Sequence, residues 1–323
     1  MPERRKSSKP KPGAPKRRAS DGIKPDRNYD ARPGYDPNFV GFTAPLPKLS
    51  KTAAKDAVTI PVRKRTENKH ELKYHHYSVI MNAARKLAFI AAVNYDGKAR
   101  VRVNRIGPDK WFADPRVEKD AQTNNALYSK NALDRGHLVR RADAGWGATK
   151  EEAKRANDDT FHFTNCSPQH EVFNQSAQAT KRNLKLWGNL ENHIGEQVAK
   201  DSARLSIFNG PVFRPDDREH RKVKVPRQFY KIVICRKDDG TPAAYGFLLS
   251  QEELISDLPL EALEAFEPGP FKVFHVPISE IEQKTHLDFG PLKDIDAKRR
   301  RGEEEGLEAF GPTAIESLDQ IVL

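Results

Sequence analysis

Three short runs in the middle of the chain decide how it is interpreted: Asp134-Arg135-Gly136-His137, then Asn165-Cys166-Ser167-Pro168-Gln169, then Phe173-Asn174-Gln175. They place an imidazole beside a guanidinium and a carboxylate, with carboxamide side chains a few tens of residues further on. Phosphodiester hydrolysis uses these kinds of group: a base that takes a proton from water, a cation for the phosphate, and oxygen ligands for a hard metal ion. A single tetrapeptide can occur by chance, so the interpretation also depends on the downstream amide residues.

Further segments with a consistent order and spacing surround these runs. They are, from the N-terminal side, Tyr77–Ile80, Phe89–Gly97, Trp111–Pro115, Trp187–Glu191, Asn209–Phe213, Val225–Lys231 and Ile281–Phe289. Together with the central runs they resemble the DNA/RNA non-specific endonuclease family, the ββα-metal nucleases that include secreted bacterial nucleases and mitochondrial endonuclease G. The resemblance covers residues 70 to 292. It implies an α+β fold with a mixed, mainly antiparallel central sheet, flanking helices and a ββα-metal active-site motif.

The resemblance also implies an activity, that of a phosphodiesterase-type endonuclease, and assigns roles by motif position. His137 matches the general base, and Asn174 matches the residue that binds a hydrated divalent ion through its amide oxygen. A hydrated ion with oxygen ligands suits Mg²⁺, which gives up water reluctantly, and we expect Mn²⁺ to be able to substitute. Without their motifs, His137 would more often be a core or surface residue and Asn174 a helix cap.

Four more residues are expected close to this pair. Asp134 is expected to orient the water around the ion, although a carboxylate before a glycine is also a common turn residue. Asn165 is expected to support the site by hydrogen bonding. Arg135 and Arg105 offer planar guanidinium groups to phosphate oxygens. Arg105 aligns only loosely, because two other arginines lie on the same stretch.

Glu191 matches the acidic residue of the family that reaches the ion through water, but its spacing departs from the family pattern. It follows Asn174 by seventeen residues, much further than usual. Seventeen uninterrupted helical positions would separate the two by about 25 Å and put them on different faces. The inserted segment, residues 177–185, must therefore loop out if Glu191 serves the site. Its basic residues fit contact with nucleic acid and equally fit a solvated loop.

Composition places much of the positive charge in one tail. The chain has 323 residues, of which 37% are hydrophobic, a low share for a protein folded throughout. Its first eighteen residues hold a net charge of +7 out of the total of +11, interspersed with prolines that oppose a helix. Such a tail attracts phosphate backbones without reading sequence, while a simple solubilising extension is the alternative.

These patterns divide the chain into three parts. Residues 1–66 are predicted to be a basic, proline-rich disordered tail and arm, residues 67–296 the endonuclease domain, whose fold starts near Glu71, and residues 297–323 a charged C-terminal tail. Predicted strands are Val79–Ile80, Leu87–Val93, Val101–Val103, Phe161–Asn165, Leu205–Asn209, Phe229–Cys235, Ala243–Leu249 and Phe271–Pro277. Pro168 is expected to mark where the chain leaves the sheet. Predicted helices are Asn174–Val198, Glu252–Ala265 and Ile278–Thr285.

Several other classes of protein lack support in the sequence. No stretch is apolar enough for a signal-peptide core or a membrane span, so the compartment stays open. Cys166 and Cys235 are too few for a disulfide framework or a cysteine-based zinc site. Neither the paired histidines of a zinc hydrolase nor the Gly-x-Ser-x-Gly elbow of a serine hydrolase occurs.

The expected partners are DNA and RNA, bound through the phosphate backbone, because no base-reading helix motif is evident. The resemblance leaves a homodimer open. The alternative from a different class is a catalytically silent nucleic-acid-binding protein that keeps the fold and uses the basic tail.

Overall fold

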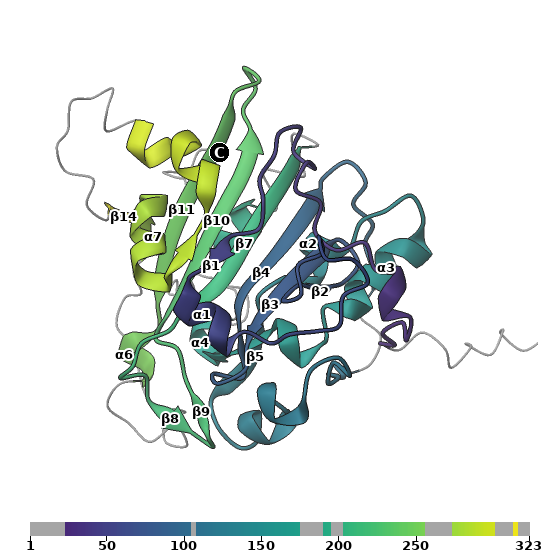
Figure 1. The fold of residues 1–323 in the computed structure, drawn as a ribbon, viewed down its shortest axis with the longest axis vertical. Coiled ribbons are helices and arrows are strands. Elements are labelled where there is room, and N and C mark those ends of the chain that lie inside the picture. The colour runs from purple at the N-terminus through teal and green to yellow at the C-terminus, as the bar shows by residue number, and fades with distance from the viewer. Residues whose placement is uncertain are drawn as a thin grey trace, which may run out of the picture.

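An antiparallel sheet forms the centre of the protein (Figure 1). The computed structural model describes residues 23–104, 108–174, 190–194, 203–255, 273–300 and 313–315. Eight strands follow one another in the order β14-β12-β11-β10-β7-β4-β3-β2, and each neighbouring pair runs antiparallel. Their bounds are β2 Leu72–Lys73, β3 Tyr77–Asn82, β4 Leu87–Asp96, β7 Arg204–Val212, β10 Gln228–Arg236, β11 Pro242–Ser250, β12 Val273–Val276 and β14 Thr313–Ile315.

The long strands of this sheet are apolar on both faces because both faces are covered. In β4, Ala91 and Val93 belong to one buried cluster, whereas Ile90 and Ala92 belong to another. Successive side chains of a strand point to opposite faces, so the two clusters are the two sides of the sheet. This explains why the sequence shows continuous apolar runs here and little alternation with polar residues.

One face of the sheet carries the layer that contains the sequence motifs. Its elements are the two-stranded ribbon of β5 (Leu133–His137) and β6 (Cys166–His170), the helices α2 (Arg141–Ala144), α3 (Lys150–Asp159) and α4 (Glu171–Asn174), and the short 3₁₀ helix η4 (Phe163–Asn165). Leu133, Phe161 and Phe173 from this layer pack into the first cluster together with Leu190. The motif residues therefore rest on a rigid sheet.

The opposite face is covered by segments from both ends of the chain. They are the arm residues around Tyr35 and Val40, α1 (Lys51–Asp56), α7 (Ile278–Thr285), the 3₁₀ helix η7 (Gly290–Ile295) and a small sheet of β1 (Lys48–Leu49) with β13 (Leu287–Asp288). In Figure 1 the arm crosses the sheet on the side that carries α1. The remaining small elements are α6 (Glu252–Ile255), β8 (Glu219–His220), β9 (Val223–Lys224) and the 3₁₀ helices η1 (Tyr29–Ala31), η2 (Lys119–Ala121) and η3 (Asn125–Tyr128).

The arm is packed structure, which differs from the predicted start of the fold near Glu71. Tyr35, Val40 and Ala44 are buried in the second cluster. They are separated by prolines, glycines and polar residues, so no helical or strand period reveals them in the sequence. The predicted tail, residues 1–22, lies outside the described residues.

Two predicted strands of the motif layer were wrong. Val101–Val103 shows alternating exposure but forms no strand, because it has no continuous strand partner: it is tied to the rest by an isolated bridge between Arg100 and Trp146 and by single hydrogen bonds such as that from the N–H of Val101 to the carbonyl of Gly145. Phe161–Asn165 ends in η4, and the strand begins only at Cys166. Pro168 lies inside β6 and does not end it. A ribbon strand with one pairing partner tolerates a residue that lacks a backbone N–H.

Of the three predicted helices, one is confirmed and the other two are described only in part. Ile278–Thr285 is confirmed as α7. The helix predicted from Asn174 onward is described only in part: α4 already begins at Glu171 and reaches Asn174, and residues 190–194 are helical. Of the helix predicted to start at Glu252, only α6 is described. The predicted C-terminal tail includes β14, which pairs with β12 at the edge of the main sheet.

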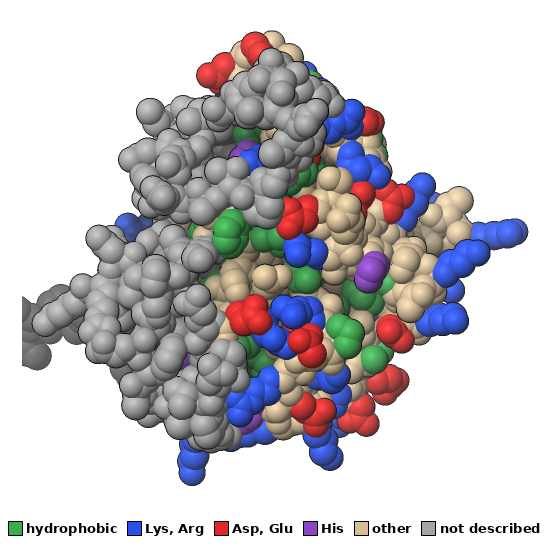
Figure 2. Space-filling model, turned by 90° about the vertical axis from the view of Figure 1, so that its left-hand side faces the viewer, with side chains coloured by type: hydrophobic (Ala, Val, Ile, Leu, Met, Phe, Trp, Pro, Cys, Tyr) green, Lys and Arg blue, Asp and Glu red, His purple; other side chains and the backbone are tan. Residues whose placement is uncertain are grey.

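On the side of the molecule seen in Figure 2, basic and acidic side chains are interspersed over the described surface. Among the described residues, none of the helices combines the length and apolar character that crossing a membrane requires. Both cysteines are buried and free of disulfide bonds.

Candidate active site

The ribbon and the helix after it bring the three sequence runs together. β5 and β6 are antiparallel, with Asp134 opposite Gln169 and His137 opposite Cys166. α4 starts at the residue after β6 and ends at Asn174. Two strands followed by a short helix thus collect residues that lie up to forty positions apart in the sequence.

Asn174 is fixed to the ribbon by a direct hydrogen bond. Its Nδ2 donates to Oδ2 of Asp134 over 2.9 Å. An amide held in this way through its nitrogen has its oxygen available as a ligand or acceptor. The carboxylate of Asp134 therefore orients the amide of Asn174, and both lie where β5 meets α4.

The surroundings of this pair suit a hydrated hard cation. Ser167 and Gln169 alternate with Pro168 along β6 and stand opposite Gly136 and Asp134, so their side chains share the ribbon face of Asp134. Both side chains are buried, and within the described part of the chain the Ser167 hydroxyl and the Gln169 amide have no hydrogen-bond partner. Buried polar groups normally bind protein, water or an ion.

A metal cage of the usual cysteine, histidine and carboxylate kind is not what this region offers. Within the described ranges, no group of three or more His, Cys, Asp or Glu side chains is placed to hold a metal ion. An amide oxygen, a neighbouring carboxylate and buried polar groups for a water shell match the preferences of Mg²⁺ better. The residues present therefore fit a hydrated divalent ion at Asn174.

His137 ends β5 with its ring against an aromatic wall. The ring centroid lies 4.5 Å from that of Trp111 and 5.0 Å from that of Phe161, which meets it edge to face. Trp111 and Phe161 also touch each other, with centroids 5.4 Å apart. These contacts limit the orientations open to the imidazole, which is the condition for a base that must face one particular water.

Asn165 holds the chain just beyond His137. Its side-chain oxygen accepts a hydrogen bond from the N–H of Val139 at 2.9 Å, and its nitrogen donates to the carbonyl of Val139 at 2.9 Å and to that of Thr160 at 3.0 Å. Its own carbonyl accepts from the N–H of Leu138 at 3.0 Å. The side chain is fully buried, so its role here is to position backbone.

Glu191 lies in the helical segment 190–194 and enters a buried cluster of charges. Its Oε1 is 3.4 Å from Nζ of Lys231, and its Oε2 is 3.6 Å from Nε of Arg140. Arg140 also pairs with Asp143 at 2.8 Å, and Lys231 donates to the amide oxygen of Asn209. The site thus includes Arg140 and Lys231, which sequence motifs alone did not single out.

Both missed cations had a signal in the sequence. Lys231 ends the segment Val225–Lys231, which carries part of the family resemblance, and Arg140 stands three positions after His137. Burial lowers the pKa of Lys231 and raises that of Glu191, while the attraction between the two charges opposes both shifts. Such a cluster keeps its geometry because a buried charge without its partner would cost several kcal/mol of free energy.

The insertion therefore leaves Glu191 anchored near the ribbon. Asn174 bonds to Asp134, and Glu191 pairs with Arg140, so the two side chains attach to opposite ends of the stretch 134–140, with His137 at its middle. The predicted loop, residues 177–185, lies outside the described residues.

Of the two arginines predicted to bind phosphate, the structure describes Arg135. Arg135 is half-buried, donates from Nε to Oδ1 of Asn125 at 3.1 Å, and lies over the ring of Tyr128. Its guanidinium retains further N–H groups for an anion. Arg105 lies outside the described residues.

Known proteins resemble this chain in sequence and in fold. A model of the family described as DNA/RNA non-specific endonuclease matches residues 55–294. Uncharacterized protein y4fB of Sinorhizobium fredii is 37% identical over 286 residues, which cover 85% of this chain and 41% of that protein. Mitochondrial endonuclease G of Bos taurus is 28% identical over 200 residues, or 58% of either chain. Nuclease C1 of Cunninghamella echinulata var. echinulata is 26% identical over 198 residues, 58% of this chain and 68% of that protein.

Among solved structures, a chain in the crystal structure of the EndoG/EndoGI complex matches 72% of this chain and 89% of its own length, with a TM-score of 0.52 and 17% identity. At that identity the likeness concerns the fold, and it agrees with the antiparallel sheet described above. The chain belongs to the DNA/RNA non-specific endonuclease family, whose model covers most of its length. It spans 41% and 58% of the lengths of the first two relatives.

Proposed function

We propose that this protein is a metal-dependent endonuclease that hydrolyses phosphodiester bonds of DNA and RNA without sequence preference. The contact of Asn174 with Asp134 on the strand that ends in His137 carries this proposal. It gathers a base and an oxygen ligand within one ββα unit, and membership of the family supports the same conclusion.

His137 serves as the general base in this proposal. The wall of Trp111 and Phe161 holds the ring, and Asn165 holds the backbone that follows it. The imidazole takes a proton from the attacking water as the oxygen approaches phosphorus. Fixing the ring in advance means that little orientational freedom is lost during the reaction.

Asn174 would hold Mg²⁺ or Mn²⁺ through its amide oxygen, with Asp134 orienting the amide. When bound, the ion supplies Lewis-acid stabilisation of the phosphoryl group and the departing oxygen. Ser167 and Gln169 offer hydrogen bonds to water on that face of the ribbon.

The charged residues around the ribbon act on the substrate and on the geometry. Arg135 offers its remaining guanidinium N–H groups to phosphate oxygens, where negative charge grows during the reaction. Glu191 is held by Arg140 and Lys231, and its role in this proposal is to orient water near Asn174. Recognition of the backbone alone accounts for the lack of sequence preference.

Cleavage of supercoiled plasmid and of a long RNA by the purified protein, with Mg²⁺ and with chelator, tests this function. We expect both nucleic acids to be cut, chelator to stop the cutting, and Asn174→Ala to require far more metal for what activity remains. Asn68→Ala is a matched control, because Asn68 is exposed and its side chain accepts a local hydrogen bond from the N–H of His70. DNA binding without cutting by the wild-type protein would instead establish the catalytically silent binder.

A further inference from the structure

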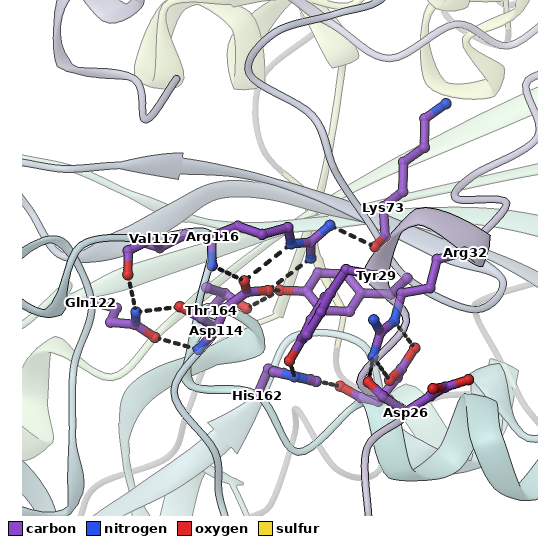
Figure 3. A network of polar contacts seen from close by, with 12 residues as sticks. Asp26, Tyr29, Arg32, Lys73, Asp114, Arg116, Val117, Gln122, His162 and Thr164 are labelled. Carbon is purple, nitrogen blue, oxygen red and sulfur yellow. Dashed lines mark hydrogen bonds and ion pairs between the residues drawn. The ribbon is translucent and has the colours of Figure 1, made fainter. Parts of the chain in front are cut away.

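Arm residues 24–32 dock on residues 158–162, which comprise the last two residues of α3 and the loop that follows it (Figure 3). The N–H of Lys24 donates to Oδ2 of Asp158 at 3.0 Å, and the hydroxyl of Tyr29 lies 2.8 Å from Nε2 of His162. Arg32 forms two hydrogen bonds to Asp159, from Nε at 2.7 Å and from Nη2 at 2.6 Å. Three contacts thus join one short segment of the arm to residues 158–162.

The pairing of Tyr29 with His162 has a defined direction. Nδ1 of His162 lies 2.7 Å from the carbonyl oxygen of Asp159, which can only accept, so this nitrogen carries the proton. Burial lowers the pKa of His162, and the neutral ring then presents Nε2 as an acceptor. The hydroxyl of Tyr29 is therefore the donor that a buried imidazole needs.

Arg32 and Asp159 form an ion pair whose side chains are both fully buried. Burial alone would raise the pKa of Asp159, but Arg32 and His75 outweigh it and hold that pKa well below its usual range. Arg32 also stacks on Tyr29, with its guanidinium carbon 3.8 Å from the ring centroid. Removing Arg32 would leave a carboxylate buried with too few partners, which is costly.

The loop that receives the arm forms part of the wall behind His137. Phe161, whose ring packs on His137, lies between Asp159 and His162 in sequence, and its carbonyl accepts from the N–H of Phe112 at 2.9 Å. Asn165, the backbone clamp, follows a few residues later. The residue that receives the hydroxyl of Tyr29, His162, is therefore the sequence neighbour of the residue whose ring packs on His137.

The next layer of the network ties the same loop to the segment that contains Trp111. Tyr74 lies 2.6 Å from the hydroxyl of Thr164 and also donates to Asp114, which forms an ion pair with Arg116 at 2.7 Å. Figure 3 shows Tyr29 between these groups and Arg32, and the guanidinium of Arg116 lies 4.6 Å from the Tyr29 ring centroid. The arm, the loop and the Trp111 segment therefore form one polar network.

Residues 24–32 of the arm lie outside the part of the chain that the family model matches, which begins at residue 55, whereas Asp159 and His162 lie inside it. We infer that Tyr29 and Arg32 are positioning residues of the active site: docking the arm on residues 158–162 holds the wall on which the imidazole of His137 packs. The expected effect on catalysis rests on the proposed function. The structural coupling between the arm and the imidazole of His137 does not depend on it.

The test compares Tyr29→Phe, Arg32→Lys and Arg32→Ala by cleavage kinetics over a range of pH and by NMR of histidine-labelled protein, with the His137 signals assigned from His137→Ala. Tyr29→Phe keeps the ring and deletes only the hydroxyl. We expect it to fold, to lower kcat about tenfold at unchanged KM, and to shift both the pH profile and the His137 ring signals. Arg32→Lys should recover part of what Arg32→Ala loses.

Two control variants separate positioning from other effects. Arg63→Ala breaks a 2.6 Å ion pair to Asp30 on the same arm whose side chains are exposed, and it should match the wild type in every measurement. Arg85→Ala breaks another Arg–Asp pair, with Asp217, whose carboxylate is buried. It should lower the unfolding temperature but leave the His137 signals and the pH profile unchanged.

Wild-type His137 signals and pH profile in Tyr29→Phe and Arg32→Lys would overturn the inference, as would the same shift in Arg85→Ala. If Arg32→Ala does not fold, Tyr29→Phe decides the matter. If the wild type cuts no nucleic acid while the arm variants still move the His137 signals, the proposed function fails and the coupling stands.

Discussion

The eight-stranded sheet and the ribbon of β5 and β6 differ in what they mainly bury. The sheet is long and regular, with every described strand paired antiparallel, and it buries mainly apolar side chains, with Lys231 and Asn209 among the exceptions. The ribbon has two short strands that include Gly136 and Pro168, and it buries polar side chains such as Gln169 whose partners are not protein groups in the described chain. Regular pairing supplies stability, whereas the ribbon carries the residues that we propose to be catalytic.

Substitution of His137 in the ribbon should have the largest effect. Replacing it with alanine should lower turnover by about 10²–10⁴-fold, the range for loss of a positioned general base, while the far-ultraviolet circular dichroism stays native. Plasmid cleavage rates measure the effect. His286→Asn, at an exposed histidine beside α7, is the control and should cut at the wild-type rate. Turnover in His137→Ala equal to that of the wild type would remove the ribbon from catalysis.

Two glycines, one in each region, give a matched pair of substitutions. A Cβ at Gly210 in β7 would lie 2.3 Å from the carbonyl oxygen of Phe89, which is sheet backbone, so Gly210→Ala should cost about 3 kcal/mol of unfolding free energy. A Cβ at Gly136 would lie 2.0 Å from Oε1 of Gln169, a side chain that can turn away. Gly136→Ala should therefore cost less stability but lower kcat about 10- to 100-fold by disturbing the site.

Urea unfolding and cleavage rates per folded molecule measure the two effects separately. Equal losses of stability in the two variants, with kcat unaffected in both, would show that ribbon and sheet do not differ in the proposed way.

Acid should weaken the ribbon through His170. Burial lowers its pKa from 6.5 to about 4, so the folded protein disfavours protonation. The stability that the neutral ring contributes is complete above pH 6.5 and is lost as the pH falls toward 4, about 2 kcal/mol by pH 4.5. In His170→Gln, the drop in unfolding free energy between pH 7 and pH 4.5 should shrink by that amount. An unchanged drop would contradict a buried neutral His170.

The basic tail, residues 1–20, should have the smallest effect, because its sequence belongs to neither the sheet nor the ribbon. Deleting residues 1–20 should weaken DNA binding mainly at low salt and make affinity less dependent on salt concentration. Fluorescence anisotropy at salt concentrations from about 50 to 200 mM, with cleavage rates at saturating DNA as the control, measures this. A salt slope identical to that of the full chain would exclude the tail from substrate binding.

The strands of the sheet were readable in the sequence because their apolar runs end in turn residues. Leu205–Asn209, Phe229–Cys235 and Ala243–Leu249 all fall inside observed strands. Phe161–Asn165 has equally strong strand composition, yet it forms a turn and η4, because the bonds of Asn165 to Val139 and Thr160 outweigh local propensity. The composition of a segment indicates which secondary structures it can adopt, and tertiary contacts determine which one forms.

Site residues followed the same division. His137, Asp134 and Asn174 were named from motifs, and the structure places the last two in contact. Arg140 and Lys231 were missed because a buried cation is recognised by its partner, and Glu191 lies forty positions from Lys231. Tyr29 and Arg32 were missed because the arm lacks any periodic pattern that would mark it as packed.

By itself, the sequence determined the family, the antiparallel sheet and the three runs that supply a base, a carboxylate and an amide, since these depend on residue type and short-range order. Only the tertiary structure decided that arm residues between Tyr35 and Ala57 pack on the sheet, that Glu191 stays anchored near the ribbon despite the insertion, and that the arm supports the wall behind His137. Each of these features depends on contacts between buried groups that are far apart in the chain. Such contacts form only when folding brings the groups together and removes them from water.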